Sequence, residues 1–388
     1  MSGLKARIAD LLPELRELRR DLHAHPEIAF QEERTGNLVA RHLEALGVEV
    51  HRMAKTGVVG VLRNGEGSAI GLRADLDALA IEEATGLPYA SRNSGRMHAC
   101  GHDGHIAMLL GAARCLVERR RFRGTVVLIF QPAEENEGGG RVMVEEGLFE
   151  RFPVDAVFGL HNWPGLPVGR FAARPGPMMA SYDVFEIVIC GRGAHAAMPQ
   201  HGVDPVVAAA QVVSALQTLV SRNVDPLRAA VVSVTQMQAG DTWNVIPATA
   251  TLRGTARSLD PAVQGLVEEG IGRVAEHVCA ALGAECSVSY QRRYPPTVNT
   301  EAETRRAWAA ASEVMGPDAV DRDPSPSMGA EDFAFMLRQR PGCYAFLGNG
   351  VAEEGRNLHS PLYDFNDDAL PVGIAYWLKL VEGPASPG

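Results

Sequence analysis

The sequence predicts an α/β protein of two domains, in which a smaller α+β domain is inserted into the larger one. The chain has 388 residues, which is long for a single hydrophobic core. Continuous apolar runs such as 125–130 and 155–160 alternate with helical patterns, as expected for a buried, mostly parallel sheet. From Ser181 the texture changes to strand, helix, strand, strand, helix, strand, which is the split βαβ pattern.

Composition and charge exclude several classes of function. The net charge of -10 and the pI near 5.7 argue against a nucleic-acid partner. No apolar run approaches the ~20 residues that cross a bilayer, and the first 20 residues lack the apolar centre of a signal peptide. The six cysteines are scattered and form no CxxC pair, which favours free thiols in a reducing compartment. We therefore expect a cytoplasmic protein with no membrane partner.

The first element is an amphipathic helix over Leu4–Leu22, whose leucines form one stripe. Pro13 interrupts this pattern, and we expect it to mark the true first turn. His23 and His25 follow, just before Pro26. We interpret these histidines as the end of the helix, where positive charge is favoured, and not as metal ligands.

Two short strands, Val58–Arg63 and Ala69–Arg73, flank Asn64-Gly65, which predicts a β-hairpin. Asp75 and Asp77 follow the second strand. Functional residues gather at the carboxyl ends of strands in α/β sheets, so these acids could serve the site. They could equally be solvated caps of the next segment, and the residues alone leave both interpretations open.

The remaining elements continue the alternation. A helix over His102–Arg121 precedes the 125–130 strand, and a strand over 155–160 ends at His161. In the inserted domain we expect strand 182–190, helix 205–220, strands 230–236 and 248–256, helix 261–281 and strand 286–290. We expect Asp204 to cap the first of these helices. The chain then returns to the first domain with a strand over 343–347. Residues 383–388 predict a frayed tail.

A candidate metal site begins in Cys100-Gly-His-Asp-Gly-His105, at the start of a predicted helix. The glycines let the backbone bend close to an ion. Glu134-Glu135 follows the 125–130 strand, so the pair could be a solvated acidic loop or part of the site. Neighbouring side chains on an extended segment diverge, so one carboxylate could bind metal while the other takes a proton from water.

His161 and His359 complete the candidate set, although either one alone is more typical of a structural or surface position. Five candidate ligands then lie on loops of one α/β core: Cys100, His102, Glu135, His161 and His359. Five ligands with one bridging suit two divalent ions about 3.5–4 Å apart. Imidazole, thiolate and carboxylate together suit zinc, manganese, cobalt or nickel. His98 and His105 remain as structural neighbours.

These motifs together resemble a known family, the co-catalytic dinuclear metallopeptidases that include aminoacylases and carboxypeptidase G. The sequence is most similar to the amidohydrolase branch, which contains hippurate hydrolase, N-acyl-amino-acid amidohydrolases and auxin-conjugate hydrolases. The resemblance rests on Leu22-His-Ala-His-Pro-Glu27, Leu72-Arg-Ala-Asp-Leu-Asp-Ala-Leu79, Met97-His-Ala-Cys-Gly-His-Asp-Gly-His105, Phe130-Gln-Pro-Ala-Glu-Glu135, Gly159-Leu-His-Asn162, Gly191-Arg-Gly-Ala-His-Ala-Ala197, Asn244-Val-Ile-Pro247, Gly329-Ala-Glu-Asp-Phe333 and His359.

The resemblance implies a zinc-peptidase-like α/β/α sandwich over 1–180 and 295–388, with a ferredoxin-like lid and dimerisation domain over 181–294. It implies that the five candidates bind two metal ions, with Cys100 as the bridge, and that Glu134 is the general base and acid. Asp77 would support the metal ligands from behind. His195 would hold the oxyanion, commonly in the partner subunit's site. Asn244 and Arg257 would hold the substrate carboxylate, with Arg253 as the alternative to Arg257.

The activity implied by the resemblance is hydrolysis of N-acyl or N-aroyl (hippurate-like) amino acids to a carboxylate and a free amino acid. A homodimer or a higher homo-oligomer is expected on the same basis. A dipeptidase or an N-acetyl-diaminopimelate-type deacetylase is the alternative within enzymes. A non-catalytic, metal-dependent binding protein is a more distant alternative, because it would be expected to lack Glu134.

Overall fold

The computed structural model describes residues 2–135, 137–351 and 355–383. The predicted frayed tail at 384–388 lies outside the described residues. The chain divides into two compact units. The core unit comprises Met1–Met178, Val298–Ser325 and Asp332–Gly388, and the inserted unit comprises Met179–Thr297 and Pro326–Glu331. The domain boundaries expected from the sequence remain a prediction.

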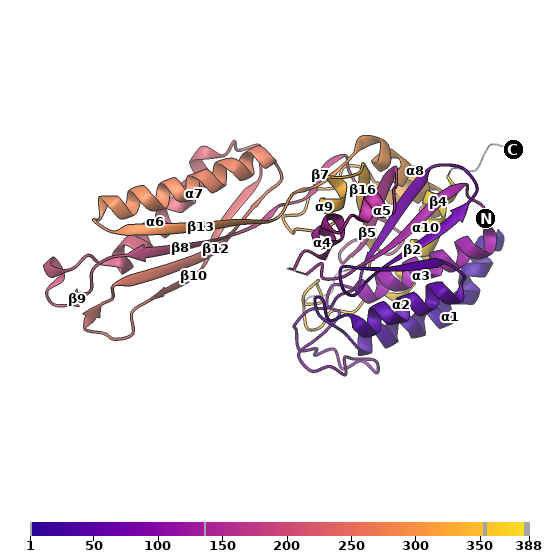
Figure 1. Cartoon of the computed structure of the whole chain (residues 1–388), viewed down its shortest axis with the longest axis horizontal. Coiled ribbons are helices and arrows are strands. Elements are labelled where there is room, and N and C mark those ends of the chain that lie inside the picture. Colours follow the sequence, from indigo (N-terminus) through magenta and orange to yellow (C-terminus); the bar gives the residue numbers. More distant parts are fainter. Residues whose placement is uncertain (1, 136, 352–354, 384–388) are drawn as a thin grey trace. The chain divides into compact units, whose positions relative to one another are not determined.

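The core unit is built on a mixed sheet with helices around it (Figure 1). Its eight strands have the order β1-β2-β4-β3-β5-β16-β6-β15. These strands are β1 Glu49–Met53, β2 Gly57–Asn64, β4 Gly124–Gln131, β3 Ala69–Asp75, β5 Ala156–Trp163, β16 Gly342–Gly348, β6 Phe171–Ala172 and β15 Val320–Asp321. The four central strands β4, β3, β5 and β16 run parallel. Their carboxyl ends therefore lie along one edge, where α/β folds place their sites.

Helices cover this sheet because their apolar stripes and the buried strands share one hydrophobic core. The longer helices are α1 Ser2–Ala24, α2 Glu33–Ala45, α3 His102–Arg119, α8 Glu301–Met315 and α10 Leu370–Glu382, and the short ones are α4 Gly139–Glu145, α5 Leu148–Arg151 and α9 Ala334–Leu337. Helices α1, α3 and α10 pack against one another. This packing fixes the start of α3, which carries part of the candidate metal site.

Two predictions about the first elements of this unit are wrong. Pro13 does not mark the first turn of the N-terminal helix but lies inside α1, on its exposed side, where the loss of one backbone hydrogen bond is tolerated. The strands on either side of Asn64-Gly65 do not form a hairpin. Both of them pair with β4, β2 in the antiparallel and β3 in the parallel direction, so β4 lies between them.

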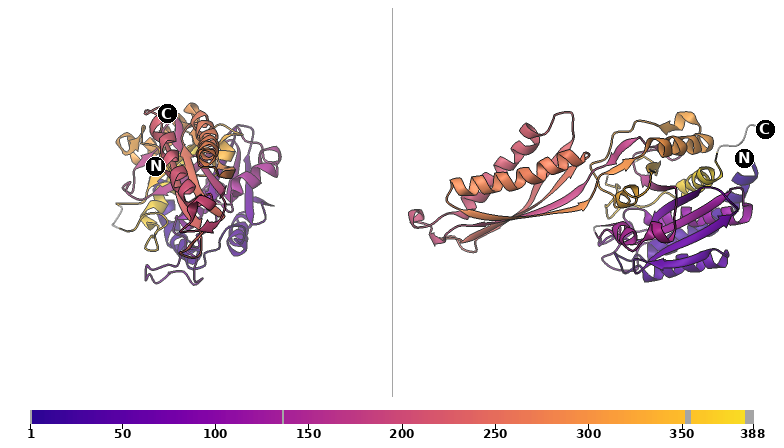
Figure 2. Two further views of the ribbon diagram at one scale, coloured as in Figure 1. Left: turned by 90° about the vertical axis from the view of Figure 1, so that its left-hand side faces the viewer. Right: turned by 45° about the horizontal axis from the view of Figure 1, so that its top comes forward.

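The inserted unit has one antiparallel sheet in the order β10-β12-β8-β13. Its elements follow the chain as β8 Tyr182–Cys190, α6 Pro205–Thr218, β10 Ala230–Ala239, β12 Thr249–Ser258, α7 Pro261–Ala281 and β13 Glu285–Tyr294. Both helices lie on the same face of the sheet (Figure 2) and share its hydrophobic cluster. Asp204 caps α6 by accepting from the N–H groups of Val206 and Val207. The expected split βαβ fold is confirmed.

A two-stranded ribbon extends from this sheet, formed by β9 Ala194–His195 and β11 Val245–Ile246. The chain passes between the two units at β7 Gly176–Met179 and β14 Thr297–Asn299. Across the described ranges, no helix has both the length and the apolar character needed to span a bilayer.

Candidate metal centre

The candidate metal centre lies at the carboxyl edge of the central strands. Glu134 and Glu135 follow the end of β4 after two residues, and Cys100 and His102 stand at the start of α3. The sequence predicted that the strand ends at His161. This prediction is wrong, because β5 continues to Trp163. The imidazole of His161 therefore projects from a hydrogen-bonded strand, which holds it more firmly than a loop would.

The structure brings the five predicted ligands together in two overlapping groups. The ligand atoms of Cys100, His102 and His161 lie within 4.8 Å of one another, and so do those of Cys100, Glu135 and His359. Cys100 Sγ is 3.3 Å from His161 Nε2, and Glu135 Oε1 is 3.1 Å from His359 Nε2. Cys100 belongs to both groups, which is the arrangement that a ligand shared by two ions requires.

The donor set fits divalent metal ions. The Nδ1 of His102 hydrogen-bonds to the Asp77 carbonyl oxygen at 2.8 Å. Its Nε2 is buried and has no hydrogen-bond partner among the described residues. The same holds for Glu135 Oε1, whose approach to His359 is an ion-pair contact without hydrogen-bond geometry. A histidine fixed through one nitrogen, with the other nitrogen aimed into a group of thiol and carboxylate donors, is typical of metal ligands.

The electrostatics of the site favour a bound cation. Burial raises the pKa of the Cys100 thiol well above its usual value, and the carboxylates of Glu135 and Glu134 raise it further. Burial opposes protonation of His102, but Asp75 and Asp77 outweigh it and raise its pKa to about 10. Without metal, the nearby carboxylates therefore favour the protonated forms of the Cys100 thiol and the His102 ring. A divalent ion would displace these protons and convert the thiol to a thiolate ligand.

Asp77 contacts two of the predicted ligands. Its side chain is fully buried, so it is not a solvated cap. Its Oδ2 accepts the backbone N–H of Glu135 at 2.9 Å, and its Oδ1 is 3.4 Å from His102 Nδ1. The carboxylate thus contacts both ligand-bearing segments from the side away from the donor atoms.

Glu134 lies beside a buried polar network that was not among the predicted site residues. Its Oε1 accepts the backbone N–H of Asp332 at 3.4 Å. The Asp332 carboxylate accepts from Gln131 Nε2 at 2.7 Å and from the Gly140 N–H at 2.7 Å, and Arg73 Nη2 lies 3.2 Å away. Asp332 stands in the Gly-Ala-Glu-Asp-Phe motif, and that motif was the signal that could have found it.

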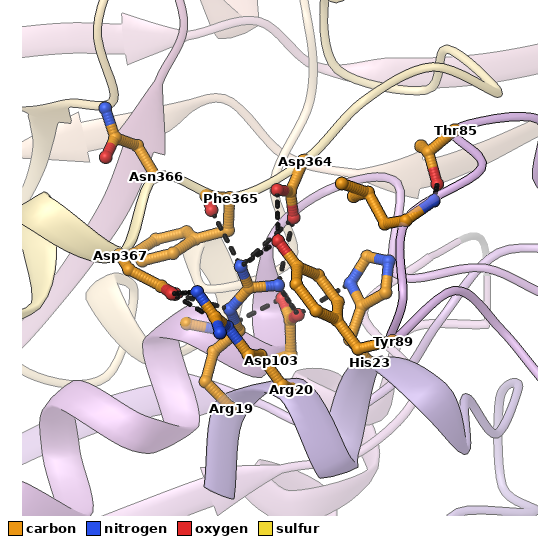
Figure 3. Close-up of polar contacts among 12 residues, drawn as sticks. Arg19, Arg20, His23, Thr85, Tyr89, Asp103, Asp364, Phe365, Asn366 and Asp367 are labelled. Atoms are coloured by element: carbon orange, nitrogen blue, oxygen red, sulfur yellow. Dashed lines mark hydrogen bonds and ion pairs between the residues drawn. The ribbon is translucent and has the colours of Figure 1, made fainter. Parts of the chain in front are cut away.

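The other histidines of the motifs are buried. His105 Nδ1 donates to Asp75 Oδ1 at 2.6 Å, whereas neither ring nitrogen of His98 has a hydrogen-bond partner among the described residues. His23 lies at the end of α1 as predicted, but it is not the simple helix terminus that we expected. It is fully buried and pairs with Asp103, at 2.8 Å, and with Glu83. Figure 3 shows His23 and Asp103 beside the Arg19 side chain.

The predicted residues of the inserted unit fall into two separate places. His195 pairs with Val245 in the ribbon, and the Ala196 N–H donates to the Asn244 carbonyl at 3.0 Å, so His195 and Asn244 lie side by side. Arg257 stands near the far end of β12, where its guanidinium covers the Tyr182 ring at 4.1 Å. The ribbon leaves the sheet at the opposite end of β12, where Thr249 pairs with Cys190, and the eight residue steps from Thr249 to Arg257 span about 26 Å. One carboxylate therefore cannot contact both Asn244 and Arg257 within a single chain.

Comparisons with known proteins find related amide hydrolases and a related dinuclear metal-binding peptidase. The model of peptidase family M20/M25/M40 matches residues 71–383. The N-acetylcysteine deacetylase of Bacillus subtilis (strain 168) is 43% identical over 367 residues, which cover 94% of either chain. The hippurate hydrolase of Campylobacter jejuni is 42% identical over 375 residues, 96% of this chain and 97% of that protein. A crystal structure of a dinuclear metal-binding M20 peptidase from Bacillus subtilis superposes with a TM-score of 0.84 at 38% identity, covering 96% and 98% of the two chains.

Proposed function

The chain belongs to peptidase family M20/M25/M40, and from that premise we propose how its residues carry out hydrolysis. Relatives at 42–43% identity are named for cleaving N-acetylcysteine and hippurate. The chain is accordingly a metal-dependent amidohydrolase of N-acyl amino acids, acting on a linear amide bond. The observation that carries the mechanism is the pair of donor groups that share Cys100, with Glu134 directly beside them.

Two divalent ions would be held by Cys100, His102, Glu135, His161 and His359, with Cys100 shared. When bound, such ions lower the pKa of water and polarise the amide carbonyl. Manganese, zinc, cobalt and nickel all suit this donor set, so we propose one of these four and expect the supply in the cell to decide among them.

Glu134 is the proposed general base and acid. Its buried carboxylate takes a proton from the attacking water, which then adds to the amide carbon. The same carboxyl group returns the proton to the departing nitrogen, which leaves as the free amino acid. The Asp332 N–H at 3.4 Å and the adjoining ligand Glu135 restrict the orientations open to the Glu134 side chain.

His195 is proposed to donate a hydrogen bond to the oxyanion of the tetrahedral intermediate. Asn244 is its neighbour in the ribbon and is proposed to hold the substrate carboxylate. Arg257 would have to act on a different group or in a different subunit from Asn244, and Arg253 is the alternative to Arg257. A homodimer in which the inserted unit serves as lid and interface, and a cytoplasmic location, remain proposals.

The experiment that tests the mechanism replaces Glu134 with alanine. We expect turnover to fall by roughly three or more orders of magnitude while the metal content stays the same, because only the proton transfers are lost. Glu137→Ala is the matched control, since Glu137 is an exposed acid on the same loop. Near-normal turnover in Glu134→Ala would exclude Glu134 as the base.

The metal ligands and the substrate class need separate measurements. Cys100→Ala and His359→Ala should each lower the metal content measured by elemental analysis, and unchanged stoichiometry would remove that residue from the site. A panel of hippurate, N-acetyl amino acids and dipeptides separates the amidohydrolase from the dipeptidase and from the diaminopimelate-type deacetylase. Preferred cleavage of dipeptides would favour the alternative enzyme, and no hydrolysis of any amide would favour a binding protein.

A further inference from the structure

Asn162 is a buried residue that links the three segments carrying the proposed ligands Cys100, His161 and His359. It follows the ligand His161 in β5 and is fully buried. Its side-chain Nδ2 donates to the carbonyl oxygen of Cys100 at 2.6 Å. Its side-chain Oδ1 accepts the hydroxyl of Tyr363 at 2.7 Å, and Tyr363 lies four residues after the ligand His359. One amide group therefore bonds the segments that carry Cys100, His161 and His359.

The backbone of Asn162 extends this connection to the aspartate behind the site. Its N–H donates to His105 Nε2 at 3.0 Å. Because Nε2 accepts this N–H, His105 Nδ1 is the donor to Asp75 Oδ1, at 2.6 Å. Every polar atom of the Asn162 side chain thus has a partner, and all of these partners are buried.

The hydroxyl of Tyr363 and the amide of Asn162 also lie directly against the backbone between two ligands. Gly101 separates Cys100 from His102 and has a φ of 85°. A Cβ at this position would be 2.4 Å from Asn162 Nδ2 and 2.4 Å from Tyr363 Oη. Glycine therefore allows the pair to approach the backbone at the point where the chain turns from the shared ligand into α3.

We infer that Tyr363 and Asn162 are positioning residues for the metal centre, which align its three ligand-bearing segments through one hydrogen-bonded pair. The inference rests on the proposed function, because the ligands that the pair aligns are those proposed to bind metal. A ligand shared by two ions must lie within a few tenths of an ångström of its place. Partners that orient metal ligands without touching the ion typically change metal affinity by about 10–100-fold.

The test compares two tyrosines that are equally buried. Tyr363→Phe removes only the hydroxyl that binds Asn162. Tyr376→Phe is the matched control, since Tyr376 is also fully buried but its hydroxyl has no hydrogen-bond partner among the described residues. Metal affinity is measured by competition with a chelator on the whole chain. We expect Tyr363→Phe to weaken binding about 10–100-fold and Tyr376→Phe to leave it unchanged.

A spectroscopic measurement separates positioning from general destabilisation. In the cobalt(II)-loaded protein, the thiolate-to-cobalt charge-transfer band reports directly on the Cys100 sulfur. We expect this band to weaken or shift in Tyr363→Phe and to match the wild type in Tyr376→Phe. Because Tyr363 acts through Asn162, Tyr363→Phe should add nothing to the loss of affinity that Asn162→Ala already causes. Wild-type affinity and an unaltered band in Tyr363→Phe, or additive losses in the double variant, would overturn the inference.

Two further measurements keep the result decisive. If Tyr363→Phe does not fold, Asn162→Asp replaces it, because this change keeps the acceptor for Tyr363 and removes the donor to the Cys100 carbonyl. The same 10–100-fold loss is expected there, and wild-type affinity would again overturn the inference. Failure of the proposed function is distinguishable, since it would appear as fewer than two ions in the wild type, or as two ions retained in Cys100→Ala.

Discussion

We expect the free energy of unfolding to depend on pH through the ionisation of His23. Its ring lies in the buried network of Figure 3, where Nδ1 contacts Asp103 Oδ2 at 2.8 Å and Nε2 contacts Glu83 Oε1 at 3.4 Å. Arg19 adds a buried guanidinium that bonds Asp103 at 3.4 Å and Asp364 at 3.0 Å. The network therefore connects α1 to the start of α3, through Asp103, and to the C-terminal segment that carries Asp364.

The sign and size of the effect follow from the pKa of His23. Burial disfavours the charged ring, but the hydrogen bonds to Asp103 and Glu83 outweigh it and raise the pKa from 6.5 to about 9. A raised pKa stabilises the fold fully below the unfolded value of 6.5, and this stabilisation is lost as the pH rises through about 9. At about 1.4 kcal/mol for each tenfold change, the loss amounts to about 3 kcal/mol.

The assay is urea unfolding of the wild type and of His23→Gln, followed by tryptophan fluorescence from about pH 6 to about pH 9.5. Trp163, Trp308 and Trp377 belong to the core unit, whereas Trp243 is fully exposed, so the signal reports chiefly on the unit that contains His23. Other titrating groups cancel in the difference between the two proteins. The wild type should exceed His23→Gln in free energy of unfolding at about pH 6, and this excess should shrink by about 3 kcal/mol on going to about pH 9.5. An excess that stays constant with pH would refute the reasoning.

Three further predictions follow from individual contacts. Asp77→Ala removes the carboxylate that accepts the Glu135 N–H, and chelator competition should show metal affinity about 10–100-fold weaker; equal affinity would contradict this role. Gly101→Ala should cost about 2–5 kcal/mol in urea unfolding, because it combines positive φ with a 2.4 Å clash. Gly86→Ala, with positive φ and open space, should cost only about 1 kcal/mol, and equal costs would refute the clash. Pro13→Ala should stabilise the protein by about 2 kcal/mol, since it restores a bond inside α1; an unchanged denaturation midpoint would argue against that gain.

The elements that the sequence predicted well are those whose signals are local. The 261–281 helix matches α7 because Asp260 caps it and its apolar positions repeat with the helical period. The Asn64-Gly65 turn signal is also real, since Gly65 has a φ of 74°. The hairpin prediction failed because strand pairing is decided by all strands of the sheet. Pairing both strands with the apolar strand β4 buries them more fully than pairing them with each other would.

The metal-ligand candidates could be proposed because their residue types are chemically distinctive, and because Cys100 and His102 stand at the start of a helix and Glu135 follows a strand. The contacts behind them could not be predicted in the same way. Asn162 and Tyr363 are 201 positions apart, and neither residue type indicates a metal site by itself. The raised pKa of His23 likewise depends on Asp103 and Glu83, which lie 80 and 60 positions away. Such pairs are set by the tertiary fold and not by spacing along the chain.

The central claim is that two metal ions and Glu134 act together at one site. The most direct test removes metal with a chelator, returns one of the four proposed ions stepwise, and measures hydrolysis of an N-acyl amino acid together with bound metal. We predict that hydrolysis is absent without metal, returns fully at two ions per chain, and stays at least about a thousandfold lower in Glu134→Ala at the same metal content. Full hydrolysis by the chelated protein, or by fully loaded Glu134→Ala, would contradict the account.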